Sequence, residues 1–252
     1  MELPWHNYVP DFRLQAMKKW WIGCSGFYYK HWRDKFYPKG LPQRRWFEFY
    51  CGSFDTVELN VTFYRYPKPD ALRGWYNRSP DDFRFTVKAP RLITHYKKFN
   101  NAVREARDFY DLAANGLADK LGCVLFQLPP NLAYSETNLE NILSTLDPAF
   151  TNVIEFRHES WWNKHVYQTL KQHNITFCGI SYPSLPDQVI RSVPVMYYRF
   201  HGVPQLYAST YSTGKMKEIA GQINAYRGVT DVYCYFNNDI HVEAIRNALQ
   251  LK

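Results

Sequence analysis

Two short segments pair ionisable side chains at a spacing of two residues. Glu155 and Arg157 flank one phenylalanine, and Arg199 and His201 flank another. In extended chain, residues two apart point to the same face, so each pair would share a face. Arginine can hold phosphate or carboxylate through two parallel hydrogen bonds. A glutamate with a raised pKa, or a histidine, can carry protons near neutral pH. The pattern predicts a site for an anionic ligand, with Glu155 and His201 as catalytic candidates.

Further polar side chains stand near the ends of other apolar runs. Glu58 and Asn60 repeat the two-residue spacing, and Glu58 is a third acid–base candidate. Lys88 would offer an anion a point charge. Together with Arg157 and Arg199, the candidates for substrate binding are Asn60, Lys88, His95, Gln127 and Asn237. A plainer interpretation stays open, in which Glu58 is an ion-pair partner and residues 237–239 serve as turn and helix-cap residues.

The elements that must position these residues are short apolar runs separated by helical patterns. The runs are rich in β-branched, aromatic and Cys residues, as strands buried on both faces should be. We expect eight strands, at residues 20–25, 56–60, 83–88, 122–128, 152–157, 176–181, 195–200 and 232–237. In the second strand, alternation would carry Glu58, Asn60 and Thr62 on one face.

Helices are expected between these strands. The clearest covers residues 102–118, where apolar residues recur every three or four positions. Shorter apolar stripes predict helices near residues 46–50, 139–146, 162–170 and 242–249. Asn174 would end the fifth helix, and Asn238 or Asp239 would cap the last one.

The alternation of strands and helices predicts an α/β fold, a (β/α)8 TIM-type barrel. A doubly wound open sheet is the main rival, because alternation alone does not show closure. Three prolines in residues 182–194 predict an irregular unit between strands six and seven. In such barrels the functional residues gather at the carboxyl ends of the strands, where the candidates above stand.

Composition limits the protein class. The 252 residues fit a single barrel domain over 1–252, with an N-terminal extension at residues 1–18. No apolar run of about 18 residues and no signal-peptide pattern is present, so we expect a cytoplasmic protein without membrane association. Five scattered cysteines without a CxxC pair argue against a disulfide framework or zinc ribbon. The net charge of +8 favours anionic partners, with nucleic acid as the minority alternative.

Several common catalytic motifs are absent. Gly23-Cys24-Ser25-Gly26 is followed by Phe27, so it does not meet GxSxG. There is no GKS/T phosphate loop and no GxGxxG. His158-Glu159 lacks the second histidine of HExxH, because position 162 is Trp. A sequence-local metal site is not expected; a divalent ion held by distant strand ends stays open, and the cofactor is unknown.

Taken together, the motifs resemble the DUF72 (YecE-like) family of TIM-barrel proteins. The resemblance covers about residues 20–250, in the expected order, and rests on residues 22–28, 36–38, 58–64, 88–90, 93–95, 126–130, 155–158, 199–202 and 235–239. It implies a TIM-type barrel and a common pocket, and no settled activity. One departure concerns the end of strand six, where relatives often carry an acidic residue and this chain has Ser181-Tyr182-Pro183. A third carboxylate at that position is therefore not available.

Three functions remain open from the sequence. The leading hypothesis is an enzyme, of hydrolase or isomerase type by analogy of fold, acting on a small anionic or sugar-like substrate. The first alternative is a nucleic-acid-binding or nuclease-like protein, which the positive net charge and the high aromatic content favour. The second is a non-catalytic barrel that binds a ligand or a protein partner. The sequence sets no oligomeric state.

Overall fold

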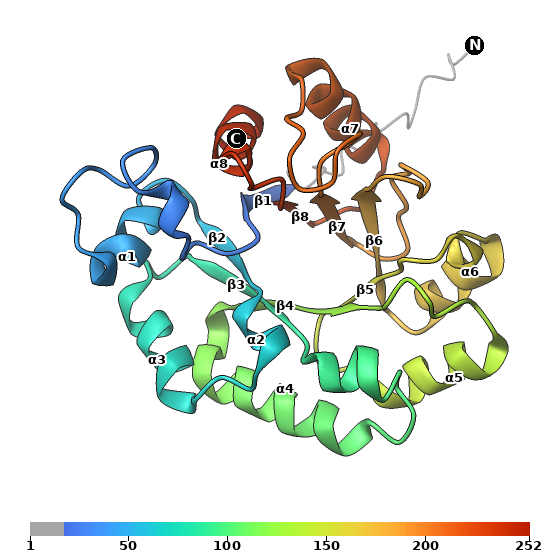
Figure 1. Cartoon of the computed structure of the whole chain (residues 1–252). Helices are drawn as coiled ribbons and strands as arrows, with labels where there is room; N and C mark the ends of the chain where they lie inside the picture. The colour runs from blue at the N-terminus through green and yellow to red at the C-terminus, as the bar shows by residue number, and fades with distance from the viewer. Residues whose placement is uncertain (1–17) are drawn as a thin grey trace, which may run out of the picture.

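The computed structural model describes residues 18–252, which form one parallel barrel surrounded by helices (Figure 1). The strands are β1 (Lys19–Cys24), β2 (Thr56–Leu59), β3 (Arg84–Lys88), β4 (Leu121–Gln127), β5 (Asn152–Glu155), β6 (Thr176–Ser181), β7 (Val195–Phe200) and β8 (Asp231–Phe236). All eight expected strands are present, with ends shifted by at most two residues. The extension expected over residues 1–18 lies, apart from Lys18, outside the described residues.

The sheet order is β1-β8-β7-β6-β5-β4-β3-β2, and every paired strand is parallel to its neighbour. At the seam between β1 and β2, a single parallel bridge joins Ser25 to Glu58. Gly23 lets the two strands approach, because a Cβ atom there would lie 2.4 Å from the carbonyl oxygen of Thr56. The barrel is thus nearly closed, which confirms the (β/α)8 prediction over the open sheet.

Helices cover the outside of the barrel (Figure 1). The α-helices are α1 (Trp46–Cys51), α2 (Val61–Tyr64), α3 (Pro69–Arg78), α4 (Val103–Leu117), α5 (Glu136–Thr145), α6 (Lys164–Gln172), α7 (Thr213–Ala225) and α8 (Glu243–Leu251). Short 3₁₀ helices lie at Lys30–Trp32, Gln43–Arg45, Ala118–Lys120 and Glu159–Trp161, and a π-helix at Leu92–Tyr96. Between β6 and β7 the described chain forms no helix, which confirms the irregular unit.

Two apolar cores stabilise this arrangement. The larger fills the space between the strands and the helices. The smaller lies inside the barrel and combines aliphatic and Cys side chains with Tyr197, Tyr233 and Tyr235. The hydroxyl of Tyr235 is hydrogen-bonded to Thr56 at 2.5 Å and to Thr86 at 3.0 Å, so its polar end is satisfied inside this core. The barrel interior is therefore a packed floor beneath the strand ends.

Some local expectations were right and others wrong. Asn174 ends α6 with a φ of 55°, as expected. The expected cap of α8 was wrong, because Val242 stands at the cap position and no side chain caps the helix. The expected face shared by Glu58 and Thr62 was also wrong, because β2 ends at Leu59 and the chain turns into α2.

No helix in residues 18–252 is long and apolar enough to cross a membrane.

Candidate functional site

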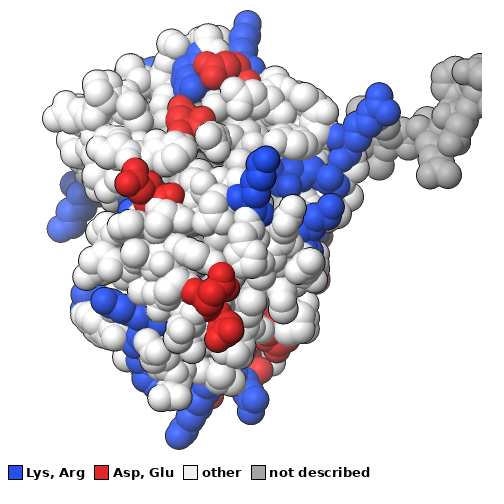
Figure 2. Space-filling view, turned by 90° about the vertical axis from the view of Figure 1, so that its right-hand side faces the viewer, with Lys and Arg blue, Asp and Glu red and all other residues white. Residues whose placement is uncertain are grey.

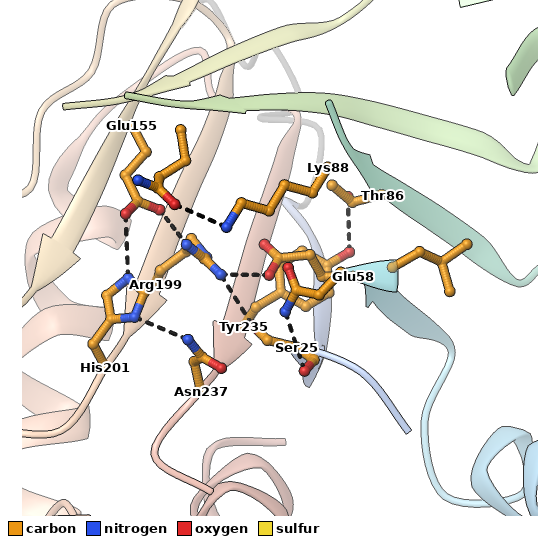
Figure 3. Close-up of polar contacts among 12 residues, drawn as sticks. Ser25, Glu58, Thr86, Lys88, Glu155, Arg199, His201, Tyr235 and Asn237 are labelled. Atoms are coloured by element: carbon orange, nitrogen blue, oxygen red, sulfur yellow. Dashed lines mark hydrogen bonds and ion pairs between the residues drawn. The ribbon is translucent and has the colours of Figure 1, made fainter. Parts of the chain in front are cut away.

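The centre of the site is a guanidinium held between two carboxylates. Arg199, from β7, donates to Glu58 of β2 at 2.6 Å through Nη2 and to Glu155 of β5 through Nη1 (Figure 3). All three side chains are at most 1% exposed. Tyr197 donates its hydroxyl to the other oxygen of Glu58 at 2.5 Å. Pairing on this scale is what allows the charges to be buried.

A second arginine binds the far side of Glu155. Arg157 donates through Nε to this carboxylate and through Nη2 to Nε2 of His201, at 3.1 Å. Its guanidinium also lies over the ring of Tyr182, 4.2 Å from the ring centre. Within residues 18–252, Nη1 of Arg157 donates to no protein atom. Two of the three guanidinium nitrogens, Nε and Nη2, are therefore held by protein atoms, and Nη1 is left without a partner in the described part of the chain.

The environment of Glu155 differs from the one expected. Burial by itself raises the pKa of this carboxyl, but the charges of Arg157 and Arg199 outweigh it and hold the pKa well below its usual range. The expectation of a raised pKa was therefore wrong for this residue. Its catalytic role stays a prediction that the charges do not favour.

His201 is also shifted away from neutral titration. Burial and the charges of Arg157 and Arg199 lower the pKa of its imidazole well below the usual value. The ring lies 3.5 Å from Glu155 through Nε2 and 3.2 Å from Asn237 through Nδ1. Because Arg157 can only donate, Nε2 accepts its hydrogen bond, as an uncharged imidazole can. The expected titration of His201 near neutral pH was therefore wrong.

A cavity of about 440 Å³ opens above these residues; we call it the polar cavity. Six of the seven predicted substrate-binding residues line it: Asn60, Lys88, Gln127, Arg157, Arg199 and Asn237. The catalytic candidates Glu58, Glu155 and His201 are not among its lining residues; they lie behind it and are fully buried. The strand ends thus meet in one place, as the barrel prediction required.

Lys88 lines the polar cavity with a buried amine whose pKa is lowered. Its Nζ donates to Oε1 of Gln127 at 2.8 Å and lies 4.1 Å from the ring centre of Phe63. Burial, helped by the charge of Arg199, lowers the pKa of its amine to about 7. A considerable fraction of this amine is therefore uncharged at neutral pH.

His95 is the predicted residue that the structure does not bring to the cavity. It lies on the π-helix Leu92–Tyr96, and its Nδ1 is hydrogen-bonded to Thr94 at 2.8 Å. Its ring meets Phe63 edge-on at 5.0 Å, and Nζ of Lys88 lies 4.1 Å from the centre of the same Phe63 ring. Burial lowers the pKa of His95 to about 4. His95 is not among the lining residues of the polar cavity, and its predicted place in the site stays a prediction.

The sequence reasoning missed an acidic residue at the cavity. Asp239, after β8, accepts from Nε1 of Trp32 at 2.7 Å and pairs with His31 at 2.8 Å. Burial raises the pKa of Asp239 to about 6, against the opposing effects of Trp32 and His31. Of the polar run Asn237-Asn238-Asp239, which follows β8, only Asn237 is among the predicted site residues; the run itself was the signal that pointed to Asp239. The other lining residues that were missed are Tyr29, His31, Tyr64, Tyr207 and Ile240.

Metal ligands do not gather in the described chain. In residues 18–252, no three His, Cys, Asp or Glu side chains are placed so that they could hold one ion. The site therefore combines paired charges, one lysine and one aspartate.

Comparison with known proteins places this architecture in a family. The profile described as "Protein of unknown function DUF72" matches residues 21–252. The UPF0759 protein YecE of Escherichia coli O157:H7 is 30% identical over 156 residues, which is 61% of this chain and 55% of that protein. The UPF0759 protein YunF of Bacillus subtilis is 26% identical over 147 residues, 54% of this chain and 50% of that protein. In these alignments the chain spans about half the length of its curated relatives.

Solved structures share the whole barrel. The crystal structure of a DUF72 family protein from Thermotoga maritima is 28% identical, with a TM-score of 0.84 over 92% of this chain and 97% of that one. A DUF72 family protein from Enterococcus faecalis, 19% identical, superposes with a TM-score of 0.75 over 92% of this chain and 94% of that one, and supports the fold alone. The barrel, the polar strand ends and the match over residues 21–252 agree, and the chain belongs to the DUF72 family.

Proposed function

We propose that this protein is an enzyme acting on a small anionic or sugar-like substrate bound in the polar cavity. The observation that carries the proposal is the state of Arg157. Glu155 and His201 hold two of its nitrogens, and Nη1 has no partner within residues 18–252. A guanidinium that is fixed at one end and lines a cavity at the other is preorganised for an anionic group.

Lys88 and Asp239 are the proposed proton carriers. Both line the polar cavity, and their pKa values of about 7 and about 6 lie close to neutral pH. General acid–base catalysis works best with groups whose pKa is near the working pH. The uncharged Lys88 amine can accept a proton from the substrate, and protonated Asp239 can return one. This chemistry suits an isomerising or hydrolytic step.

The buried charges have a supporting role in this proposal. Glu58 and Glu155 keep Arg199 and Arg157 in place, and His201 orients Arg157 through a hydrogen bond of 3.1 Å. Such residues act through the groups they position, and their exchange changes substrate binding as well as turnover.

The binding part of the proposal is tested with sulfate, which does not titrate near neutral pH. Isothermal titration should give a dissociation constant that rises at least about tenfold in Arg157→Lys, because the fork of the guanidinium is lost. Arg91→Lys is the matched control, since Arg91 is exposed and outside the cavity. Sulfate binding should weaken as the pH rises through about 7 and Lys88 loses its proton, and Lys88→Met should remove this dependence. Equal sulfate affinity in the wild type and Arg157→Lys would refute the assignment.

Turnover is tested on the sugar phosphates that compete with sulfate, followed by NMR. The wild type should convert at least one of them, and Lys88→Met should convert none. Binding without turnover would favour the non-catalytic barrel instead.

Nucleic acid remains the second candidate because of the net charge of +8. On the face seen in Figure 2, basic and acidic side chains stand in separate small groups on a mostly uncharged surface. A short oligonucleotide that binds with a steep salt dependence, and equally well to Arg157→Lys, would favour this reading.

A further inference from the structure

A second cavity of about 570 Å³ adjoins the polar cavity; we call it the aromatic cavity. It is formed by the chain after β1, the 3₁₀ helix Gln43–Arg45, α1, α2 and α3, and its walls include Phe27, Tyr28, Val61 and Trp75. The two cavities share three lining residues, Tyr29, Asn60 and Tyr64. One ligand could therefore extend from one cavity into the other.

The aromatic cavity presents rings and apolar surface to solvent. Tyr28 is 58% exposed, Tyr64 66% and Val61 40%. Behind them, Phe27 meets Trp75 edge-on at 6.2 Å and is itself buried, so the floor is a packed aromatic layer. Exposed apolar groups that gather at a hollow are typical of a binding site.

The charged side chains that line the aromatic cavity are all positive. Three arginines line it, Arg44, Arg65 and Arg78, and no aspartate or glutamate does. Arg78 pairs with Glu48 at 3.1 Å, whereas Arg44 and Arg65 form no ion pair with any residue of the described part of the chain. Guanidinium groups beside aromatic rings suit a flat, electron-rich or anionic group, which they can stack on or hydrogen-bond.

We propose that the aromatic cavity holds the planar ring of a ligand whose anionic group is bound by Arg157 in the polar cavity, and that a nucleoside monophosphate is the class of ligand that joins the two. The phosphate meets Arg157, the ribose passes Asn60, and the base stacks among Tyr28, Tyr64 and Trp75. This inference rests on the proposed anion site and names the substrate class of that site.

The experiment compares ligands with and without the ring by isothermal titration. The probes are AMP, UMP, ribose 5-phosphate and adenosine. Stacking on one aromatic side chain is worth about tenfold in affinity. In the wild type, AMP or UMP should bind at least about tenfold more tightly than ribose 5-phosphate, and adenosine should bind more weakly than AMP.

Two substitutions confined to the aromatic cavity separate the ring from the phosphate. Tyr28→Ala removes a stacking ring, and Val61→Trp fills the space. Each should reduce the nucleotide advantage to threefold or less and leave ribose 5-phosphate binding unchanged. Tyr96→Ala is the matched control, because Tyr96 is 64% exposed and lines neither cavity. Melting curves confirm that each variant is folded.

The outcomes distinguish this inference from the proposed function. Ribose 5-phosphate that binds through Arg157 as tightly as both nucleotides would overturn the ring site alone. A nucleotide advantage that survives both Tyr28→Ala and Val61→Trp would do the same. Failure of every phosphate to bind would overturn the anion site, and the inference with it.

Discussion

Replacing Arg199 by methionine tests the reasoning about the buried charges most directly. The substitution keeps an unbranched side chain and removes the cation between Glu58 and Glu155. Glu155 keeps Arg157, but Glu58 keeps only the hydroxyl of Tyr197. The main cost should therefore fall on Glu58, a carboxylate with no exposed surface.

The size of the effect follows from the geometry. Two unit charges at the Nη2–Oε1 distance of 2.6 Å attract by about 6 kcal/mol at an effective dielectric constant of about 20. Part of this attraction only offsets the cost of burying the arginine. Breaking a buried pair by removing one partner costs about 3–5 kcal/mol, and we expect this loss in the free energy of unfolding. Adding Glu58→Gln to Arg199→Met should restore at least about 1 kcal/mol, because the isolated charge is gone.

Urea denaturation followed by circular dichroism measures these differences. Arg246→Met is the control: Arg246 pairs with Glu243 at 3.1 Å, but its side chain is 67% exposed. Its loss should cost at most about 1 kcal/mol. A loss below about 1 kcal/mol in Arg199→Met, or no recovery in the double variant, would show that the carboxylates do not depend on Arg199.

Three further predictions concern the seam and the titrating groups. Gly23→Ala should lower the free energy of unfolding by about 1–3 kcal/mol in urea, because the new Cβ meets the carbonyl oxygen of Thr56 at 2.4 Å; an unchanged urea midpoint would contradict the tight seam. The pKa of Lys88, lowered to about 7, means that the folded state binds fewer protons than the unfolded chain above that pH. Urea titrations from pH 7 to 10 should show the wild type gaining stability relative to Lys88→Met, and a constant difference would argue against a buried amine. The raised pKa of Asp239, about 6, has the opposite effect: the folded state binds more protons than the unfolded chain below that pH. The wild type should lose stability relative to Asp239→Asn as the pH rises from about 4 to about 6, and parallel curves would place that aspartate in solvent.

The sequence predicted the barrel well because strand patterns are local. Eight apolar runs and their polar ends are visible without any knowledge of long-range contacts, and the three prolines after residue 181 marked the irregular unit. What failed was local geometry at the strand ends. Alternation cannot show where a strand stops, so Thr62 was assigned to β2 although the chain turns into α2 after Leu59.

The chemistry of the site depends on contacts between side chains of different strands, which the spacing of residues along the sequence does not show. The spacing of Glu155 and Arg157 placed both at the site, yet it could not show that they bind each other and that Arg199 binds the same carboxylate. Those contacts decide which groups stay charged, and they move the proposed proton transfer to Lys88 and Asp239. Asp239 was overlooked because its partner Trp32 is 207 residues away in the chain.

The position of Arg199 also constrains how the chain can be divided. Its carboxylate partners lie 141 and 44 residues earlier in the sequence, in strands that do not neighbour β7. A fragment that stops before β7 would leave Glu58 without the cation that compensates it and Glu155 with Arg157 alone. We therefore expect a chain ending at residue 181 to lack a cooperative urea transition, unlike a barrel assembled from independently stable halves.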